Sequence, residues 1–107
     1  MVIKRFEIWR TNLEPVKGSE ISKTRPCVVI SPDVSNKYLN TVTIAAMTTS
    51  IKTNPTRVDC TFKAKKGQVA LDQIRSVDKT RLIKRLGILD EDTNKNICKV
   101  LIETFSY

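Results

Sequence analysis

The sequence predicts a small, mainly β fold with helices: a twisted antiparallel sheet or SH3-like barrel completed by a C-terminal helix. Several short runs rich in β-branched and aromatic residues are separated by proline, glycine and polar residues, which is the pattern of short strands joined by turns. Clear helical periodicity is confined to the end of the chain. With 107 residues, we expect one domain spanning residues 1–107.

The first predicted strand covers residues 6–13, FEIWRTNL. Aromatic and aliphatic side chains are spaced there as in a strand, and Pro15 ends the run. Trp9 is expected to anchor the core or an interface. Residues 17–25 contain Gly18 and have no periodicity, so we expect a surface loop.

Two more strands are predicted before the middle of the chain. Residues 26–31, PCVVIS, form a short apolar run that Pro32 ends. Residues 41–47, TVTIAAM, have the β-branched content of a buried strand. The polar stretch between them, residues 33–40, is expected to be a loop.

A hairpin is predicted next. Residues 56–62, TRVDCTF, alternate in polarity, and residues 63–67 are expected to form the turn before a strand that contains QVAL. Residues 72–86 are basic and fit either short strands or a helical turn. In residues 56–62, the first strand of this hairpin, the alternation places Val58, Cys60 and Phe62 inward and Arg57, Asp59 and Thr61 outward.

The C-terminal helix is the clearest element. Asp90 is a candidate N-cap, and the acidic residues that follow it suit the first turn of a helix. The apolar positions share one helical face, which we expect to cover the sheet, with dimerisation as the alternative. These positions are Ile97, Cys98, Leu101, Ile102 and Phe105.

The charge balance favours a polyanionic partner. There are 19 Lys and Arg residues against 11 Asp and Glu residues, which gives a formal net charge of +8. The alternative is that the excess charge serves solubility alone. No apolar run is long enough for a membrane span, and the first ten residues lack a signal-peptide core, so we expect a cytoplasmic protein.

The cysteine pattern supports neither a disulfide framework nor a metal knuckle. Cys27, Cys60 and Cys98 are far apart and odd in number, and the first two are expected in the core. The sequence has no histidine, which excludes a Ser-His-Asp triad and a paired-histidine ribonuclease mechanism. We expect neither a metal ion nor another cofactor.

Polar residues gather where the predicted strands begin and end. One group lies in the loop before the second strand, a second follows the third strand, and a third follows QVAL. The members are Ser19, Glu20 and Arg25; Thr48, Thr49 and Ser50; and Asp72, Gln73 and Arg75.

The segments that carry these groups also resemble a known family. KGSEISKTRPCVVISPDVSN, VTIAAMTTS and GQVALDQIRSVDKTRL, in this order, are similar to the MazF/PemK/Kid toxins of toxin-antitoxin systems, and the similarity runs from Glu7 to Leu86. The resemblance implies a cytoplasmic, homodimeric endoribonuclease toxin, an mRNA interferase, with a compact β-barrel-like sheet. Such toxins cleave single-stranded RNA at short sequences without a metal. An acidic segment of a cognate antitoxin blocks them.

The resemblance also implies roles for individual residues. Arg25 and Thr48 match the positions most consistently tied to catalysis, and Glu20 matches a loop acid involved in RNA contact or proton transfer. Ser19, Thr49, Ser50, Asp72 and Gln73 are then expected to contact RNA. Two positions depart from the family: Phe6 replaces a small residue, and Ala70 stands where some relatives carry a catalytic arginine. The chain therefore resembles the Arg-Thr subtype.

The chemistry of these residues suits attack of the RNA 2′-hydroxyl, which leaves a 2′,3′-cyclic phosphate. Arg25 would stabilise charge on the phosphate and Thr48 would add a hydroxyl donor. The general base is open between Glu20 and Asp72.

Each residue also has a structural alternative. Arg25 would then pair with Glu20, Thr48 would cap a turn, and Asp72 and Gln73 would fix one. The cluster of Lys79, Arg81, Lys84 and Arg85 is either a solvated face or an attractive surface for RNA or an acidic partner. The alternative function is a non-catalytic nucleic-acid binder or a gyrase poison on the same fold.

Overall fold

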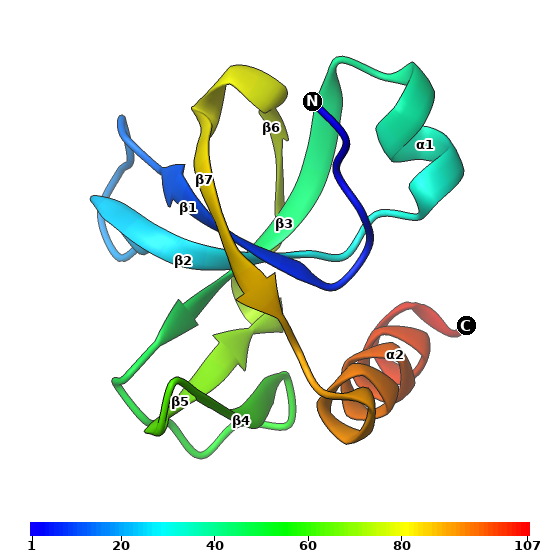
Figure 1. Ribbon diagram of the computed structural model, residues 1–107. Coiled ribbons are helices and arrows are strands. Elements are labelled where there is room, and N and C mark those ends of the chain that lie inside the picture. The colour runs from blue at the N-terminus through cyan, green and yellow to red at the C-terminus, as the bar shows by residue number, and fades with distance from the viewer.

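Seven antiparallel strands form one strongly curled sheet in the computed structural model, which describes residues 1–107 (Figure 1). The strand order is β4-β5-β3-β2-β1-β7, and β6 pairs with β3 beside this path. The predicted mainly β fold with a C-terminal helix is confirmed. The strands are β1 (Glu7–Asn12), β2 (Thr24–Val29), β3 (Thr41–Thr48), β4 (Arg57–Phe62), β5 (Lys65–Ala70), β6 (Arg75–Asp78) and β7 (Leu82–Ile88).

Two α-helices and two short 3-10 turns complete the chain. Helix α1 (Asp33–Tyr38) follows β2, and α2 (Glu91–Phe105) ends the fold beside the curled sheet (Figure 1). The 3-10 turns are η1 (Leu71–Gln73) and η2 (Lys79–Arg81). Neither helix combines the length and the apolar character that crossing a bilayer requires.

The sheet buries apolar side chains on both of its faces. Successive residues of a strand point to opposite faces, so β3 contributes Ala45 and Met47 to one cluster and Ile44 and Ala46 to the other. The first cluster packs against Ile97 of α2. Strand β3 is therefore the central strand of the fold, fixed on both faces. Trp9 and Cys27 are buried in the second cluster and Cys60 in the first, which confirms their prediction as core residues.

The expected loop at residues 33–40 is wrong in part, because residues 33–38 form α1. Asn36 is 2% exposed and is bonded to Ser31. Its Nδ2 donates to the Ser31 carbonyl over 2.9 Å, while its Oδ1 accepts from the Ser31 hydroxyl over 2.5 Å. The helix has only six residues, so no periodic apolar pattern in the sequence predicts it.

The predicted hairpin forms, but its turn is shorter than the expected residues 63–67. Strand β5 already begins at Lys65, and Lys63 and Ala64 make the turn with φ of 51° and 62°. Such a turn usually contains Asn-Gly, which is absent here. Arg57 was expected to point outward and is instead 8% exposed, because it is paired inside the fold.

The basic stretch at residues 72–86, ambiguous in sequence, forms mostly strands. Strand β6 pairs with β3, and β7 pairs with β1. Within the basic cluster at residues 79–85, Arg85 donates from Nε to the buried Glu7 over 2.6 Å. Arg85 therefore has a structural partner, Glu7, in the sheet.

Helix α2 begins where the sequence predicts. The Asp90 side chain accepts from the Thr93 amide and so caps the helix. Ile97 is fully buried, as expected for the face that covers the sheet. Ile102 and Phe105 remain 66% and 69% exposed, so the end of the apolar face is not covered by this chain.

Candidate active site

Arg25 and Thr48 point to the same face of the sheet from neighbouring strands. The antiparallel register of β2 and β3 pairs Cys27 with Ala46. Two residues further along each strand, in opposite directions, this register sets Arg25 opposite Thr48. The β2–β3 ladder ends before that point, at the Cys27–Ala46 pair, whereas on its other edge β3 pairs with β5 at Met47 and Thr48. The two side chains therefore flank a gap between separating strands.

A cavity of about 220 Å³ occupies this gap, and we call it the strand-end pocket. Its wall carries three cationic side chains and two threonine hydroxyls, and it has no carboxylate. An anion is the ligand that such a lining favours. The lining residues are Arg25, Pro26, Met47, Thr48, Thr49, Cys60, Phe62, Lys65, Lys66 and Gly67.

The guanidinium of Arg25 is tethered at one end only. Its Nε donates to the carbonyl oxygen of Ser22 over 3.0 Å. The two terminal nitrogens have no hydrogen-bond partner in the chain, and Arg25 belongs to none of the ion pairs. The alternative pairing of Arg25 with Glu20 is thus absent. A planar fork of donors remains available to an oxyanion.

The hydroxyl of Thr48 is oriented by the backbone. Its Oγ1 accepts a hydrogen bond from the Ser50 amide over 3.1 Å, so Thr48 does cap the turn after β3. This bond uses an oxygen lone pair and leaves the O–H free to donate. Capping and donation are therefore compatible. Ser50 lies outside the strand-end pocket and acts on it through its amide.

Gly67 allows β5 to lie directly against Thr48. A Cβ at Gly67 would lie 2.6 Å from the Thr48 carbonyl oxygen, closer than real Cβ contacts come. Beside it, Gln68 is 4% exposed and accepts from the Lys52 amide over 3.0 Å. These residues fix the end of β3. Sequence reasoning missed both, although a glycine inside a strand signals close backbone approach.

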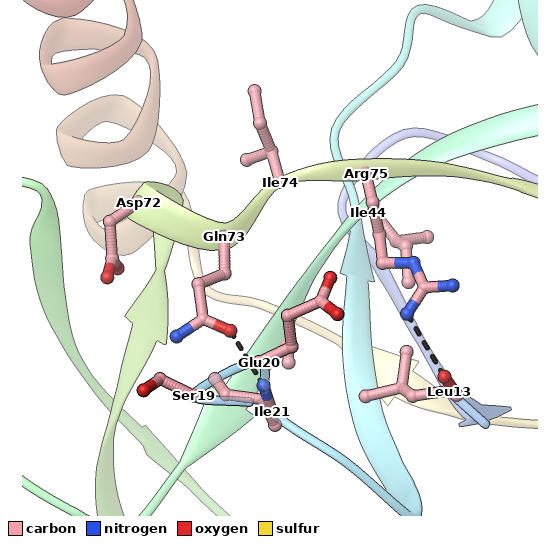
Figure 2. A pocket seen from close by; sticks show the side chains of 10 residues that line it. Leu13, Ser19, Glu20, Ile21, Ile44, Asp72, Gln73, Ile74 and Arg75 are labelled. Carbon is pink, nitrogen blue, oxygen red and sulfur yellow. Dashed lines mark hydrogen bonds between the residues drawn. The ribbon is translucent and has the colours of Figure 1, made fainter. Parts of the chain in front are cut away.

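A second cavity of about 520 Å³ lies beneath the loop that joins β1 to β2, and we call it the loop pocket (Figure 2). It contains four of the predicted site residues: Ser19, Glu20, Asp72 and Gln73. Its full lining is Leu13, Ser19, Glu20, Ile21, Ile44, Ala46, Asp72, Gln73, Ile74 and Arg75.

Two hydrogen bonds tie this loop to η1 and β6, and Figure 2 shows both. Gln73 Oε1 accepts from the Ile21 amide over 2.7 Å, and Arg75 Nη1 donates to the Leu13 carbonyl over 3.0 Å. The amide nitrogen of Gln73 makes no hydrogen bond within the chain. Gln73 therefore both positions the loop and retains two donors for a ligand.

The two predicted carboxylates differ in availability. Glu20 is exposed, and its Oε1 accepts from the Lys17 amide, which leaves the second oxygen without a partner. Asp72 binds Arg57 through both oxygens, at 2.7 Å and 3.3 Å. The Arg57 side chain is only 2% exposed. Sequence alternation placed Arg57 on the outside, so it gave no sign of this buried pair.

The two pockets adjoin along β3 but do not merge. Ile44 and Ala46 line the loop pocket, and Thr48, the next residue on that face, lines the strand-end pocket. The predicted site is thus divided between them. Arg25, Thr48 and Thr49 share one pocket, and the two carboxylates share the other.

The remaining titratable group in the strand-end pocket is a thiol. Burial, followed by the nearby carboxylates of Asp59 and Asp90, raises the pKa of Cys60 to about 11. Cys60 is therefore a neutral wall residue at physiological pH. No cluster of three His, Cys, Asp or Glu residues is arranged to hold a metal ion.

Comparison with known proteins identifies relatives over nearly the whole chain. A family model described as "PemK-like, MazF-like toxin of type II toxin-antitoxin system" matches residues 4–105. The chain is 40% identical over 96 residues to a protein of Staphylococcus epidermidis named Endoribonuclease MazF, covering 84% of this chain and 80% of that one.

Solved structures share the fold. MazF from Deinococcus radiodurans superposes with a TM-score of 0.86 at 23% identity, covering 100% of this chain and 99% of the other. An endoribonuclease in complex with its cognate antitoxin from a mycobacterial species superposes with a TM-score of 0.82 at 22% identity, covering 98% of each chain.

Proposed function

This chain belongs to the PemK-like, MazF-like toxin family of type II toxin-antitoxin systems, and we propose that Arg25 and Thr48 form the centre with which it cleaves RNA. The protein is an endoribonuclease toxin, in line with its 40% identity to an endoribonuclease over most of both chains. The observation that carries the residue assignment is the convergence of Arg25 and Thr48 on one cationic pocket.

The proposed reaction is attack of the RNA 2′-hydroxyl oxygen on the adjacent phosphorus. The 2′-hydroxyl gives its proton to a general base as its oxygen bonds to phosphorus, and the bond to the 5′ oxygen breaks. The 5′ oxygen takes up a proton from water, which leaves a 2′,3′-cyclic phosphate and a 5′-hydroxyl fragment. Negative charge grows on the two non-bridging oxygens. DNA lacks the attacking hydroxyl, so it is not a substrate.

Arg25 would stabilise that charge. Its two free terminal nitrogens match the geometry of two phosphate oxygens. Loss of one preorganised oxyanion donor in other enzymes lowers the rate by about 10² to 10³. The tether from Nε to Ser22 supports this role, because it orients the fork before substrate arrives.

Thr48 would donate its hydroxyl proton to the same phosphate. The Ser50 amide holds the oxygen in place, and the close approach of Gly67 supports the backbone behind it. A hydrogen bond to a charged group contributes about 1.5 to 3 kcal/mol. Thr48 is thus expected to contribute less than Arg25.

Glu20 is the better candidate for the proton acceptor. One of its oxygens has no partner, whereas both oxygens of Asp72 are engaged by Arg57. Glu20 lies in the loop pocket, so it would act on a ribose that bridges the two pockets. The loop that carries it is held by Gln73 and Arg75, and near its start by Arg81, which donates to the Glu14 carbonyl.

Single-stranded RNA is the proposed substrate, because its unpaired bases can enter adjoining pockets. Ser19 and Gln73 would contact it in the loop pocket, Thr49 in the strand-end pocket and Ser50 beside that pocket. Asp72 lines the loop pocket and, through its pair with Arg57, would fix the wall of that pocket. We propose that the toxin acts in the cytoplasm as a homodimer and that a cognate acidic antitoxin binds and neutralises it. A solved mycobacterial endoribonuclease of the same fold is in complex with its cognate antitoxin.

The test is incubation of the purified protein with a long single-stranded RNA in excess chelator. We expect discrete fragments that end in 2′,3′-cyclic phosphate. Intact RNA at high protein concentration would overturn the proposal. Trapped cleaved DNA in a gyrase assay, with RNA spared, would instead support a gyrase poison on this fold.

A further inference from the structure

The strand-end pocket has a second cationic wall that the proposed chemistry leaves unused. Lys65 and Lys66 open β5 and line the pocket opposite Arg25. Both side chains are exposed, and no carboxylate lies within ion-pair distance of either. Lys65 and Lys66 are thus two cations without an ion-pair partner beside the proposed phosphate site, and their position requires an explanation.

The strand register fixes the relation of Lys66 to Thr48. Thr48 is paired with Gln68 across the β3–β5 ladder, and Lys66 lies two residues before Gln68 on the same face. Such diagonal neighbours are about 7 to 8 Å apart, which a lysine side chain spans. Thr48 is thus flanked by Arg25 on one edge of β3 and by Lys66 on the other.

The hairpin that carries these lysines is anchored at two points. Gly67 packs against the Thr48 carbonyl without room for a Cβ. At the hairpin end, a Cβ on Gly87 would lie 3.1 Å from ring atom Cε1 of Phe62, so the ring packs directly on the β7 backbone. The lysine Cα positions are therefore held in a fixed relation to Thr48. The backbone beneath the two lysines therefore needs no further ordering when their side chains bind an anion.

We propose that Lys65 and Lys66 form a phosphate-binding subsite for the RNA phosphate next to the scissile one, which sets where the strand lies across Arg25 and Thr48. This inference rests on the proposed function. RNA is favoured over an acidic peptide because the two lysines share one cavity with Arg25 and the Thr48 hydroxyl. They are positioning residues, since they do not touch the reacting atoms.

The test compares Lys65→Gln, Lys66→Gln and the double variant with Lys63→Gln. Lys63 is the matched control because it lies in the same hairpin and carries the same charge, but sits over the Phe62 ring at 5.3 Å and outside the pocket lining. Two readouts are used: steady-state cleavage of a single-stranded RNA, and salt-dependent binding of the same oligonucleotide made uncleavable by 2′-deoxy substitution.

We expect KM to rise about three- to ten-fold for each pocket lysine at low salt, with kcat nearly unchanged. The plot of log binding constant against log salt concentration should become less steep, its slope decreasing in magnitude by about 0.7 for each lysine removed. Lys66→Arg should restore both values, and Lys63→Gln should leave both near wild type.

Two results would overturn the subsite. One is that the double variant cleaves and binds like Lys63→Gln. The other is that it leaves RNA binding intact but loses affinity for a polyglutamate peptide, which would assign the surface to an acidic protein. A wild-type protein that never cleaves RNA, yet binds the uncleavable strand with the lysine-dependent slope, would refute the proposed function and retain the subsite.

Discussion

A Cβ added to Gly67 would lie 2.6 Å from the carbonyl oxygen of Thr48. The strand that supports the pocket therefore approaches the proposed catalytic threonine as closely as a backbone can. Because the obstructing atom is backbone and not the end of a flexible side chain, a larger residue must move β5 or β3. The position of the Thr48 hydroxyl depends on this glycine.

Gly67→Ala should accordingly lower both stability and activity. Overpacking of this kind costs roughly 1 to 3 kcal/mol, and the displaced hydroxyl should lower kcat more than the loss of folded protein explains. Urea unfolding and single-turnover cleavage measure the two effects. Gly18→Ala is the control, since nothing lies within 4 Å of that Cβ and only the positive φ of 54° adds strain. A Gly67→Ala enzyme with full activity per folded molecule would contradict this account of Thr48.

Asp72 is expected to be a structural residue. Asp72→Ala removes both acceptors of the buried Arg57 guanidinium and should destabilise the fold by about 2 kcal/mol or more. This value is below that for a fully buried ion pair, because the Asp72 carboxylate is one-third exposed to solvent. The double change Arg57→Met with Asp72→Leu should recover much of this loss. Urea unfolding tests both. If Asp72→Asn abolishes cleavage while stability is unchanged, Asp72 is the general base instead.

Acid should weaken the protein partly through Glu7. Burial alone would raise the pKa of Glu7, but hydrogen bonds from the Lys4 amide, Arg85 and Trp9 outweigh it and hold the pKa below the ordinary value of 4.5. A depressed pKa contributes stability above pH 4.5 that is lost as the pH falls through the folded-state pKa.

Glu7→Gln should therefore destabilise the fold most near neutral pH and least in acid. Urea midpoints measured from about pH 7 down to about pH 3 give the comparison. A difference between the variant and the wild type that stays constant, or grows, toward acid would show that the carboxylate is not the group responsible.

The three thiols should differ in reactivity. Burial raises the pKa of Cys27 to about 12 and that of Cys60 to about 11, so their thiolate fractions at pH 8 are on the order of 10⁻³ or below. Cys98 is only partly buried and should react first with a maleimide. Mass spectrometry of the labelled protein identifies which thiol has reacted. The Cys98→Ser protein should stay nearly unlabelled until denaturant is added. Rapid labelling of Cys60 in the native state would mean that the strand-end pocket opens.

The local patterns in the sequence predicted those elements whose stability is set by local chemistry. Strand β3 and helix α2 were predicted correctly because β-branched content and an aspartate cap are visible in single segments. Helix α1 was missed because its six residues show no apolar period, and the Asn36–Ser31 bonds that hold it leave no periodic pattern in the sequence.

Only part of the site could be predicted, because local motifs do not show which segments meet in the fold. Motif residues identified the loop and strand ends, but register decided which of them meet. The register of β2 and β3 sets Arg25 opposite Thr48, where both line the strand-end pocket, whereas Glu20 and Asp72 line the adjoining loop pocket. The Arg57–Asp72 pair joins segments 15 residues apart in sequence and follows no periodicity.

The central claim is that Arg25 and Thr48 act on one phosphate. A double-mutant cycle with Arg25→Ala and Thr48→Val, followed by single-turnover cleavage in chelator, tests it most directly. Arg10→Ala, at an exposed arginine on the neighbouring strand β1, serves as a control for the loss of one positive charge. Circular dichroism must show that each variant is folded.

We predict a rate loss of about 10² or more for Arg25→Ala and about tenfold or more for Thr48→Val. The double variant should lose clearly less than the product of the two, with a coupling of about 1 kcal/mol or more. A near-normal rate in either single variant, or losses that multiply fully, would show that the two residues do not share a phosphate.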